Sequence, residues 1–193
     1  HTVQHGTIAG HWRELLQRAN VVDRQKLLSD YFSGGVLTHL NLNQFECDNL
    51  DSINTPLDIR LQITAYNQLD HVSGLYIMPL PLPLSTPTQK ALFSNKRYND
   101  LDLDALFELA PVRETVELVL PKGFQLAEMP VNQQFSSPFG DYTLSFEKTA
   151  SGLRIRREVV FHQRFIDHTD FQELKKYYLR MLDADDLLLA LKK

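Results

Sequence analysis

The chain has 193 residues, of which 43% are apolar and 23% are charged, and its formal net charge at pH 7 is −4. This composition excludes a disordered chain, and the length is sufficient to bury a core without a disulfide or a metal. The weak negative charge gives no reason to expect nucleic acid or an anionic membrane as a partner. The single cysteine excludes an internal disulfide, and no apolar run reaches the roughly 20 residues of a membrane span.

Residues 1–35 are predicted to form a helical lead-in. His1–Gly6 is expected to be untethered. A helix follows, because apolar residues recur on one helical face at Ile8, Trp12, Leu15, Leu16 and Ala19. A second helix is predicted over Asp23–Phe32, ended by Ser33-Gly34-Gly35. The two helices are expected to form a hairpin.

Extended segments are predicted next. Val36–Glu46 is rich in alternating residues, with Leu40 and Leu42 on one face. Leu57–Ala65 alternates strictly between apolar and polar residues. This period of two predicts a strand with one buried and one solvated face, as antiparallel sheets allow.

The middle of the chain is less regular. Asn67–His71 is expected to turn the chain into a return strand at Leu75–Leu80. Pro79–Leu84 has a proline at every second position, which excludes a central strand and favours an extended edge or polyproline-like connection. A short helix is predicted at Pro87–Phe93, and Asn95–Pro111 is expected to be a long acidic connection.

The β pattern then resumes, with turns predicted at Gly140-Asp141 and Ser151-Gly152. Short strands separated by Gly, Pro and Asn are typical of an antiparallel sandwich or barrel. The expected strands lie within Val116–Leu120, Phe124–Met129, Gln133–Phe135, Tyr142–Phe146 and Leu153–Phe161.

The last part of the chain predicts a helix, and Leu187–Leu191 is either a final helical turn or a closing edge strand. The helix is capped by Thr169 or Asp170 and carries an apolar stripe of Phe171, Leu174, Tyr178, Met181 and Leu182. The predicted fold class is α+β, dominated by an antiparallel β-sandwich, with an N-terminal helical hairpin and a C-terminal helix packed on the sheet. Residues 36–193 are expected to form the sandwich-like domain. Residues 85–111 are the best place for an internal domain boundary.

Cys47 is the single candidate for a nucleophilic thiol. It lies between Glu46 and Asp48, whose negative charges disfavour a thiolate, so an inert cysteine is expected. A cysteine hydrolase that uses Cys47 with His39 or His71 would need the thiol and an imidazole within hydrogen-bonding reach.

The acidic loop with Asp100, Asp102 and Asp104 resembles the first positions of a calcium loop. That loop needs Gly at its sixth position and Glu at its twelfth, where this chain has Ala105 and Pro111. A solvated acidic loop is therefore expected. His162 and His168, with Asp167 between them, match no ligand spacing of known mechanism, and surface positions are expected for them.

One basic cluster is present, and cross-strand pairing with acidic side chains is its expected role. It consists of Arg154, Arg156, Arg157 and Arg164, with Glu147, Glu158 and Asp141 as candidate partners. The motif search identifies no catalytic residue, cofactor site or metal ligand set.

A set of weak motifs carries a family resemblance through its order. The motifs are Leu120-Pro121-Lys122-Gly123-Phe124, Pro130, Gly140-Asp141-Tyr142, Leu153–Arg157, the helix at Asp170–Tyr178 and Leu187–Leu191. The earlier part agrees through Gly10, Arg13, Thr55-Pro56-Leu57, Gly74-Leu75, Met78-Pro79 and Arg97. In this order they resemble the C-terminal domain of unknown function in bacterial transglutaminase-like proteins.

The resemblance implies an accessory domain that follows a papain-like core and has no counterpart of the core's Cys–His–Asp set. It also implies export to the periplasm or cell surface. We therefore expect a non-catalytic domain that packs against the catalytic core of the same polypeptide or positions partners for it, with other proteins or peptides as further candidate partners. The candidate interaction surface is an exposed apolar patch of Trp12, Tyr31, Leu80, Leu82 and Leu84.

Two alternatives belong to other functional classes. A carbohydrate- or peptide-binding sandwich would use Tyr66, Tyr76 or Tyr98 as stacking platforms. The cysteine hydrolase built on Cys47 is the second. The sequence leaves the parent protein's substrate and the oligomeric state open.

Overall fold

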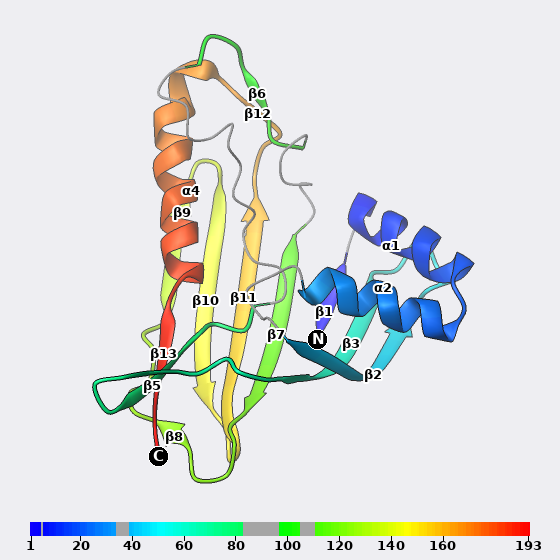
Figure 1. Cartoon of the computed structure of the whole chain (residues 1–193). Coiled ribbons are helices and arrows are strands. Elements are labelled where there is room, and N and C mark those ends of the chain that lie inside the picture. Colours follow the sequence, from blue (N-terminus) through cyan, green and yellow to red (C-terminus); the bar gives the residue numbers. More distant parts are fainter. Residues whose placement is uncertain (5, 34–38, 83–96, 105–110) are drawn as a thin grey trace.

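The structure is a computed structural model that describes the whole chain except residues 5, 34–38, 83–96 and 105–110. Its largest element is a seven-stranded antiparallel sheet, sheet A, with strand order β2-β3-β1-β7-β11-β10-β9 (Figure 1). These strands are β1 (Thr2–Gln4), β2 (Leu40–Asp48), β3 (Leu57–Ala65), β7 (Val112–Val119), β9 (Gln133–Ser137), β10 (Gly140–Lys148) and β11 (Gly152–Phe161).

Two smaller sheets complete the β structure. Sheet B has the order β4-β5-β13-β8 and consists of β4 (Asp70–Val72), β5 (Leu75–Pro79), β8 (Gln125–Leu126) and β13 (Leu188–Lys192). The third sheet pairs β6 (Leu101–Asp102) with β12 (Phe165–Ile166). The described helices are α1 (Gly6–Arg18), α2 (Val21–Ser33), α4 (Phe171–Asp185) and the short 3₁₀ helix η2 (His168–Asp170).

The side chains on one face of sheet A contribute to two hydrophobic cores. The larger core lies under α4 and sheet B, where Phe171, Leu174 and Tyr178 of α4 pack with Tyr142 and Leu144 of β10. In the smaller core, the α1–α2 hairpin packs against β2 and β3 at the right of Figure 1. This arrangement confirms the predicted α+β fold, with a helical hairpin near the N-terminus and a C-terminal helix packed on the sheet.

The smaller core shows why alternation predicted β3 so well. Leu57 and Ile59 are buried and point toward Trp12 and Leu28 of the hairpin. Arg60 lies on the opposite, solvated face. Successive side chains in a strand point to opposite faces, so a strictly alternating sequence specifies both the strand and its buried side.

The expectation that His1–Gly6 is untethered is wrong. Thr2–Gln4 forms β1, which pairs antiparallel with Leu57–Ile59 of β3 on one side and with Arg113–Glu114 of β7 on the other. The short strand therefore joins the hairpin half of sheet A to the sandwich half. A three-residue strand carries too little pattern to be recognised from its own sequence.

The return strand predicted at Leu75–Leu80 belongs to a different sheet from Leu57–Ala65, the strand predicted before it. β5 does not pair with β3; it belongs to sheet B, between β4 and β13. The tight turn of this region is Ser73-Gly74, between β4 and β5, and both residues have positive φ. Positive φ is easily adopted by glycine, so this local signal was present in the sequence.

Leu187–Leu191 is mostly a strand, and it is not at an edge. β13 lies between β5 and β8, and its Leu189 and Leu191 are buried in the larger core. The predicted turn at Gly140-Asp141 is shifted by two residues, because Pro138-Phe139 make the turn and Gly140 opens β10. Gly140 is required for close packing, since a Cβ there would collide with the Val160 carbonyl oxygen.

The proline-rich segment is described as far as Leu82. β5 ends at Pro79, and the Leu80 N–H donates to the Leu187 carbonyl oxygen at 3.2 Å. The predicted helix at Pro87–Phe93 and most of the region searched for a domain boundary lie outside the described residues. Among the helices that are described, none has the combination of length and hydropathy that a membrane crossing requires.

Candidate functional site

Cys47 lies near the end of β2, half-buried against the smaller core. Burial raises the pKa of its thiol, Arg24 lowers that pKa, and Asp48 and Asp58 raise it further. The net effect is a raised pKa, which disfavours the thiolate that a nucleophile or metal ligand needs.

Neither candidate histidine is placed to activate this thiol. His39 precedes the opposite end of β2, roughly 25 Å away at ~3.3 Å per strand residue. His71 belongs to β4 in sheet B, beside Tyr76 and the larger core. The arrangement therefore gives no support to a cysteine hydrolase built on Cys47.

The acidic loop does not converge on one point. Arg164 donates from Nε and Nη2 to the Asp102 carboxylate at 3.0 and 2.8 Å, and its Nη1 lies 3.6 Å from Asp104. The hydrogen bond from Arg164 holds the pKa of Asp102 below its usual value. These contacts fasten β6 to the segment that leads into β12.

Asp100 instead faces Asp167 and His168, and one potential ligand atom from each of the three residues lies within 4.8 Å of the others. A carboxylate–imidazole set of this kind can bind a divalent cation. All three side chains are exposed, however, and their oxygens already accept local hydrogen bonds. Asp167 Oδ1 accepts from Thr169 N at 2.8 Å, and Asp100 Oδ1 accepts from His168 N at 3.1 Å. Capping of η2 accounts for the cluster.

The outer face of sheet A carries two of the four arginines of the basic cluster, Arg154 and Arg156. Arg154 contacts Glu117 and Glu147, and Arg156 contacts Glu147, so the expected cross-strand pairing is confirmed for Glu147. The hydrogen bond from Arg154 lowers the pKa of Glu147. The other two candidate acids pair elsewhere: Glu158 with Arg113, and Asp141 with His162.

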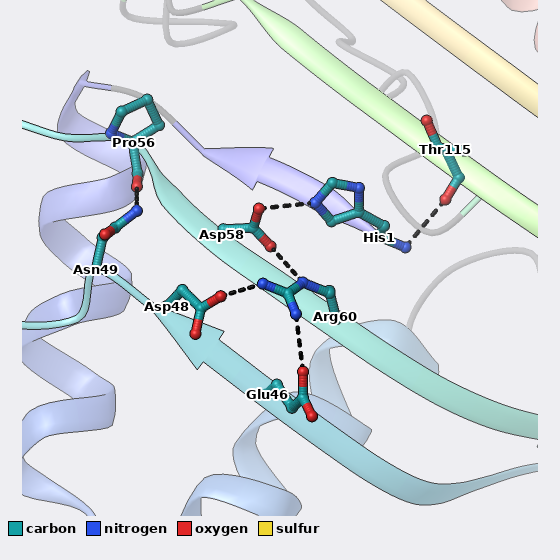
Figure 2. Close-up of polar contacts among 8 residues, drawn as sticks. All are labelled: His1, Glu46, Asp48, Asn49, Pro56, Asp58, Arg60 and Thr115. Atoms are coloured by element: carbon teal, nitrogen blue, oxygen red, sulfur yellow. Dashed lines mark hydrogen bonds and ion pairs between the residues drawn. The ribbon is translucent and has the colours of Figure 1, made fainter.

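The same outer face continues across β1 onto β2 and β3. Figure 2 shows Arg60 surrounded by Glu46, Asp48 and Asp58, with His1 on the far side of Asp58. His1 Nε2 lies 2.9 Å from Asp58 Oδ2. This half of the face therefore also carries ion pairs at the surface, which contribute little stability individually but make the surface polar.

Arg157 differs from its neighbours, because it points into the protein. Its Nη1 donates to Asp185 Oδ2 at 2.5 Å, and its Nε lies 2.8 Å from Glu114 Oε2. Tyr142 Oη donates to the other oxygen of Asp185 at 2.6 Å. All four side chains are buried, and burial together with Asp185 raises the pKa of Tyr142. This network joins β7, β10, β11 and the end of α4.

Sequence reasoning missed this network, although a signal for part of it existed. Arg157 is separated by even numbers of residues from Leu153, Ile155 and Val159 on the same strand, so alternation alone places it on the buried face. A buried arginine requires buried carboxylates. Nothing in the local sequence indicates that Glu114 and Asp185 are the ones that meet it.

The expected interaction surface does not exist as one exposed patch. Trp12 is 5% exposed, and Leu80 and Leu82 are buried in the larger core. Tyr31 is 42% exposed and stacks edge-on against Trp12 at a centroid distance of 4.7 Å. Leu84 lies outside the described residues. The apolar side chains of this set that can be placed serve mainly as core, because the segment after β5 runs inward.

The three candidate stacking tyrosines fall into two groups. Tyr66 and Tyr98 are 53% and 76% exposed. Tyr76 is half-buried, with ring contacts to His71 and Phe124 at 4.8 and 5.0 Å. Two of the three rings therefore have the exposure that a stacking platform needs.

Comparison with known proteins gives one match among solved structures and one among protein families. The crystal structure of a "putative protease" from Parabacteroides distasonis ATCC 8503 matches with a TM-score of 0.47 and 18% sequence identity over 63% of this chain. The chain spans 24% of that protein's length. No curated protein matches significantly. The model of a family described as "Domain of Unknown Function with solved-structure structure (DUF3858)" matches residues 74–191. This match covers more than half of the sequence, and the chain belongs to the DUF3858 family.

Proposed function

We propose that the chain is a non-catalytic accessory domain of a bacterial transglutaminase-like, papain-like protein. It packs against the catalytic core of the same polypeptide or positions partners for it. Support comes from the motif order described above and from the family match, which begins at Gly74 and ends at Leu191 and so covers most of those motifs.

The observation that carries the non-catalytic part is the state of the chain's one thiol. A papain-like reaction needs a thiolate beside an imidazole. Cys47 has a raised pKa, and the charged groups that act on it are Arg24, Asp48 and Asp58 rather than a histidine. The charged clusters of the described residues are paired with one another in ways that tie strands and helices together.

We propose that the outer face of sheet A is the surface that contacts the catalytic core of the parent protein. The larger and smaller hydrophobic cores both lie on the inner face of sheet A, and many of its outer side chains form ion pairs at the surface. Interfaces between domains of one chain are more polar than permanent subunit interfaces, so a charged sheet face suits this role. Arg154 and Arg156 lie on β11, which is next to the central strand β7.

The resemblance also motivates a location. Proteins of the transglutaminase-like kind that it points to are commonly exported, so we place the parent protein in the periplasm or at the cell surface. Fractionation of cells that express the tagged parent protein tests this, and recovery in the cytosolic fraction would contradict it.

The decisive experiment compares the parent protein with a variant that lacks residues 1–193. The accessory role predicts that deletion lowers the solubility or the melting temperature of the core, or its activity. Unchanged solubility, stability and activity would overturn the proposal.

Charge reversal then tests the assigned surface. Arg154→Glu with Arg156→Glu should reproduce part of the deletion effect, because both reversals meet whatever faces sheet A. Lys176→Glu is the matched control, since Lys176 is an exposed cation on α4, away from that face. Equal effects of the two variants would exclude the outer face as the contact.

A carbohydrate- or peptide-binding module is the second candidate, favoured by the exposure of Tyr66 and Tyr98. Aromatic rings of this kind stack on sugars or on peptide side chains. A glycan and peptide array tests it directly. Binding that is lost in Tyr66→Ala or Tyr98→Ala would support this candidate, and an array without binding would remove it.

A further inference from the structure

β1 is much shorter than the two strands between which it lies. β3 extends to Ala65 and β7 extends to Val119, but β1 pairs only with the first residues of each. The other edge of each long strand is paired along its length, β3 with β2 and β7 with β11. Among the described residues, no strand pairs with the β1-facing edges of Leu61–Ala65 and Val116–Val119. We call this place the slot.

The register shows that the slot continues the path of β1. Thr2 is opposite both Ile59 and Glu114. His1 N and O exchange hydrogen bonds of 3.0 and 2.9 Å with Thr115 O and N. Figure 2 shows His1 lying between β3, which carries Asp58, and Thr115 of β7. A residue attached before His1 would therefore stand opposite Leu61 and Val116, and the one two positions earlier opposite Ile63 and Leu118.

Both edges of the slot carry backbone groups suited to a strand. In an antiparallel ladder, alternate residues direct their N–H and C=O toward a given neighbour. Since Thr115 bonds to His1, Glu117 and Val119 direct theirs into the slot, and by the same alternation Leu61, Ile63 and Ala65 do so from β3. Unpaired strand edges are templates for further pairing.

The side chains around the slot specify what fits. On the inner face its walls are Leu61 and Ile63 from the smaller core, and Val116 and Leu118 from the larger core, all partly buried. On the outer face the wall residues include Gln62 and Glu117, which are exposed. An occupant with apolar residues facing inward and polar residues facing outward would join the two cores into one.

We propose that the slot is filled by a strand of the same polypeptide that runs directly into His1. Its residues at the first, third and fifth positions before His1 are apolar and face inward, and those at the second and fourth are polar. This rests on the proposed function, under which further polypeptide precedes His1. We assign the strand to the same polypeptide because β1, which it would continue, already fixes its direction and its register with β3 and β7.

Hydrogen exchange in the parent protein and in the 193-residue chain tests the proposal. The amides of Leu61, Ile63, Ala65, Glu117 and Val119 should exchange at least about tenfold more slowly in the parent, because each gains a hydrogen-bond acceptor. The amides of Gln62 and Thr64 are the internal control, since they face β2 in both proteins. Equal exchange of the slot amides in the two proteins would overturn the proposal, as would a parent sequence without the alternating pattern.

A second measurement uses the 193-residue chain with two five-residue extensions before His1. One places apolar residues at the first, third and fifth positions before His1 and polar residues at the second and fourth, and the other places polar residues at the first, third and fifth positions and apolar residues at the second and fourth. The first should protect the slot amides and the second should not, because a one-residue shift puts its apolar groups on the wet face. Equal protection by both would show pairing without the inferred register and would overturn the proposal.

The outcomes separate this proposal from the accessory role. If the slot amides exchange slowly in the parent protein, but deletion of the domain leaves the solubility, stability and activity of the catalytic core unchanged, the accessory role alone is overturned. A core that needs the domain, with slot amides that exchange freely, would overturn the strand alone.

Discussion

Replacing Arg157 with Met should lower the free energy of unfolding by about 3–5 kcal/mol. The Arg157 side chain is 3% exposed, and it lies between the carboxylates of Glu114 and Asp185, which are 1% and 5% exposed. Methionine nearly fills the space but leaves two buried carboxylates without their cation. The loss is dominated by this uncompensated charge rather than by lost packing.

Urea denaturation, followed by circular dichroism and by Trp12 fluorescence, measures the change in midpoint at constant slope. Arg156→Met is the matched control, because Arg156 is the neighbouring residue on the same strand but is 52% exposed, with a 3.1 Å contact to Glu147. An exposed pair of this kind is worth about 0–1 kcal/mol. If the two variants lose equal stability, the buried network does not hold β7, β11 and α4 together as described.

Three further predictions concern the core and the thiol. Burial raises the pKa of Tyr142, so the stability that this difference in pKa contributes is complete below about pH 10, where an unfolded tyrosine ionises, and is lost as the pH rises above that value. Tyr142→Phe should therefore flatten the alkaline decline in the urea midpoint, and Tyr66→Phe should leave that decline unchanged. Leu189→Ala should lower the free energy of unfolding by about 2–5 kcal/mol in the same assay, whereas Leu188→Ala, at a 61% exposed position, should lower it by no more than about 0.5 kcal/mol. Similar losses for the two variants would contradict the burial of one face of β13. Cys47 should react with a thiol reagent at pH 7.5 more slowly than free cysteine, because the thiol is half-buried and its pKa is raised. Reaction at the rate of free cysteine would show that the thiol is neither buried nor suppressed.

The elements that the sequence predicts well are those whose local pattern matches their final environment. Leu57–Ala65 was predicted at the boundaries that β3 has, because its apolar face packs on the hairpin and its polar face is wet. The helix at Phe171–Asp185 likewise turns its predicted stripe toward the sheet. The pairing partner of a strand is not predicted by its local pattern. β5 pairs with β13, more than 100 residues later, and nothing in Leu75–Pro79 states that preference.

The candidate surface failed for a related physical reason. Leu80 and Leu82 alternate with prolines, which rules out an inner strand but says nothing about which way the leucines face. The segment runs inward because Leu80 bonds to Leu187, beside β13. Composition identifies apolar residues, whereas exposure depends on what the rest of the chain places over them.

The position of β13 has a consequence for how the protein is made. This strand lies between β5 and β8, and Leu189 and Leu191 fill the larger core. While the ribosome is still adding the last residues of this region, sheet B lacks its central strand, and β5 and β8 each have an open edge. The sandwich half can therefore close only after Leu188–Lys192 has emerged, whereas the α1–α2 hairpin with β2 and β3 has most of its contacts within the first 65 residues. Synthesis should thus pass through a stage in which a folded hairpin half precedes an incomplete sandwich, and that stage is when exposed strand edges are most open to misassembly.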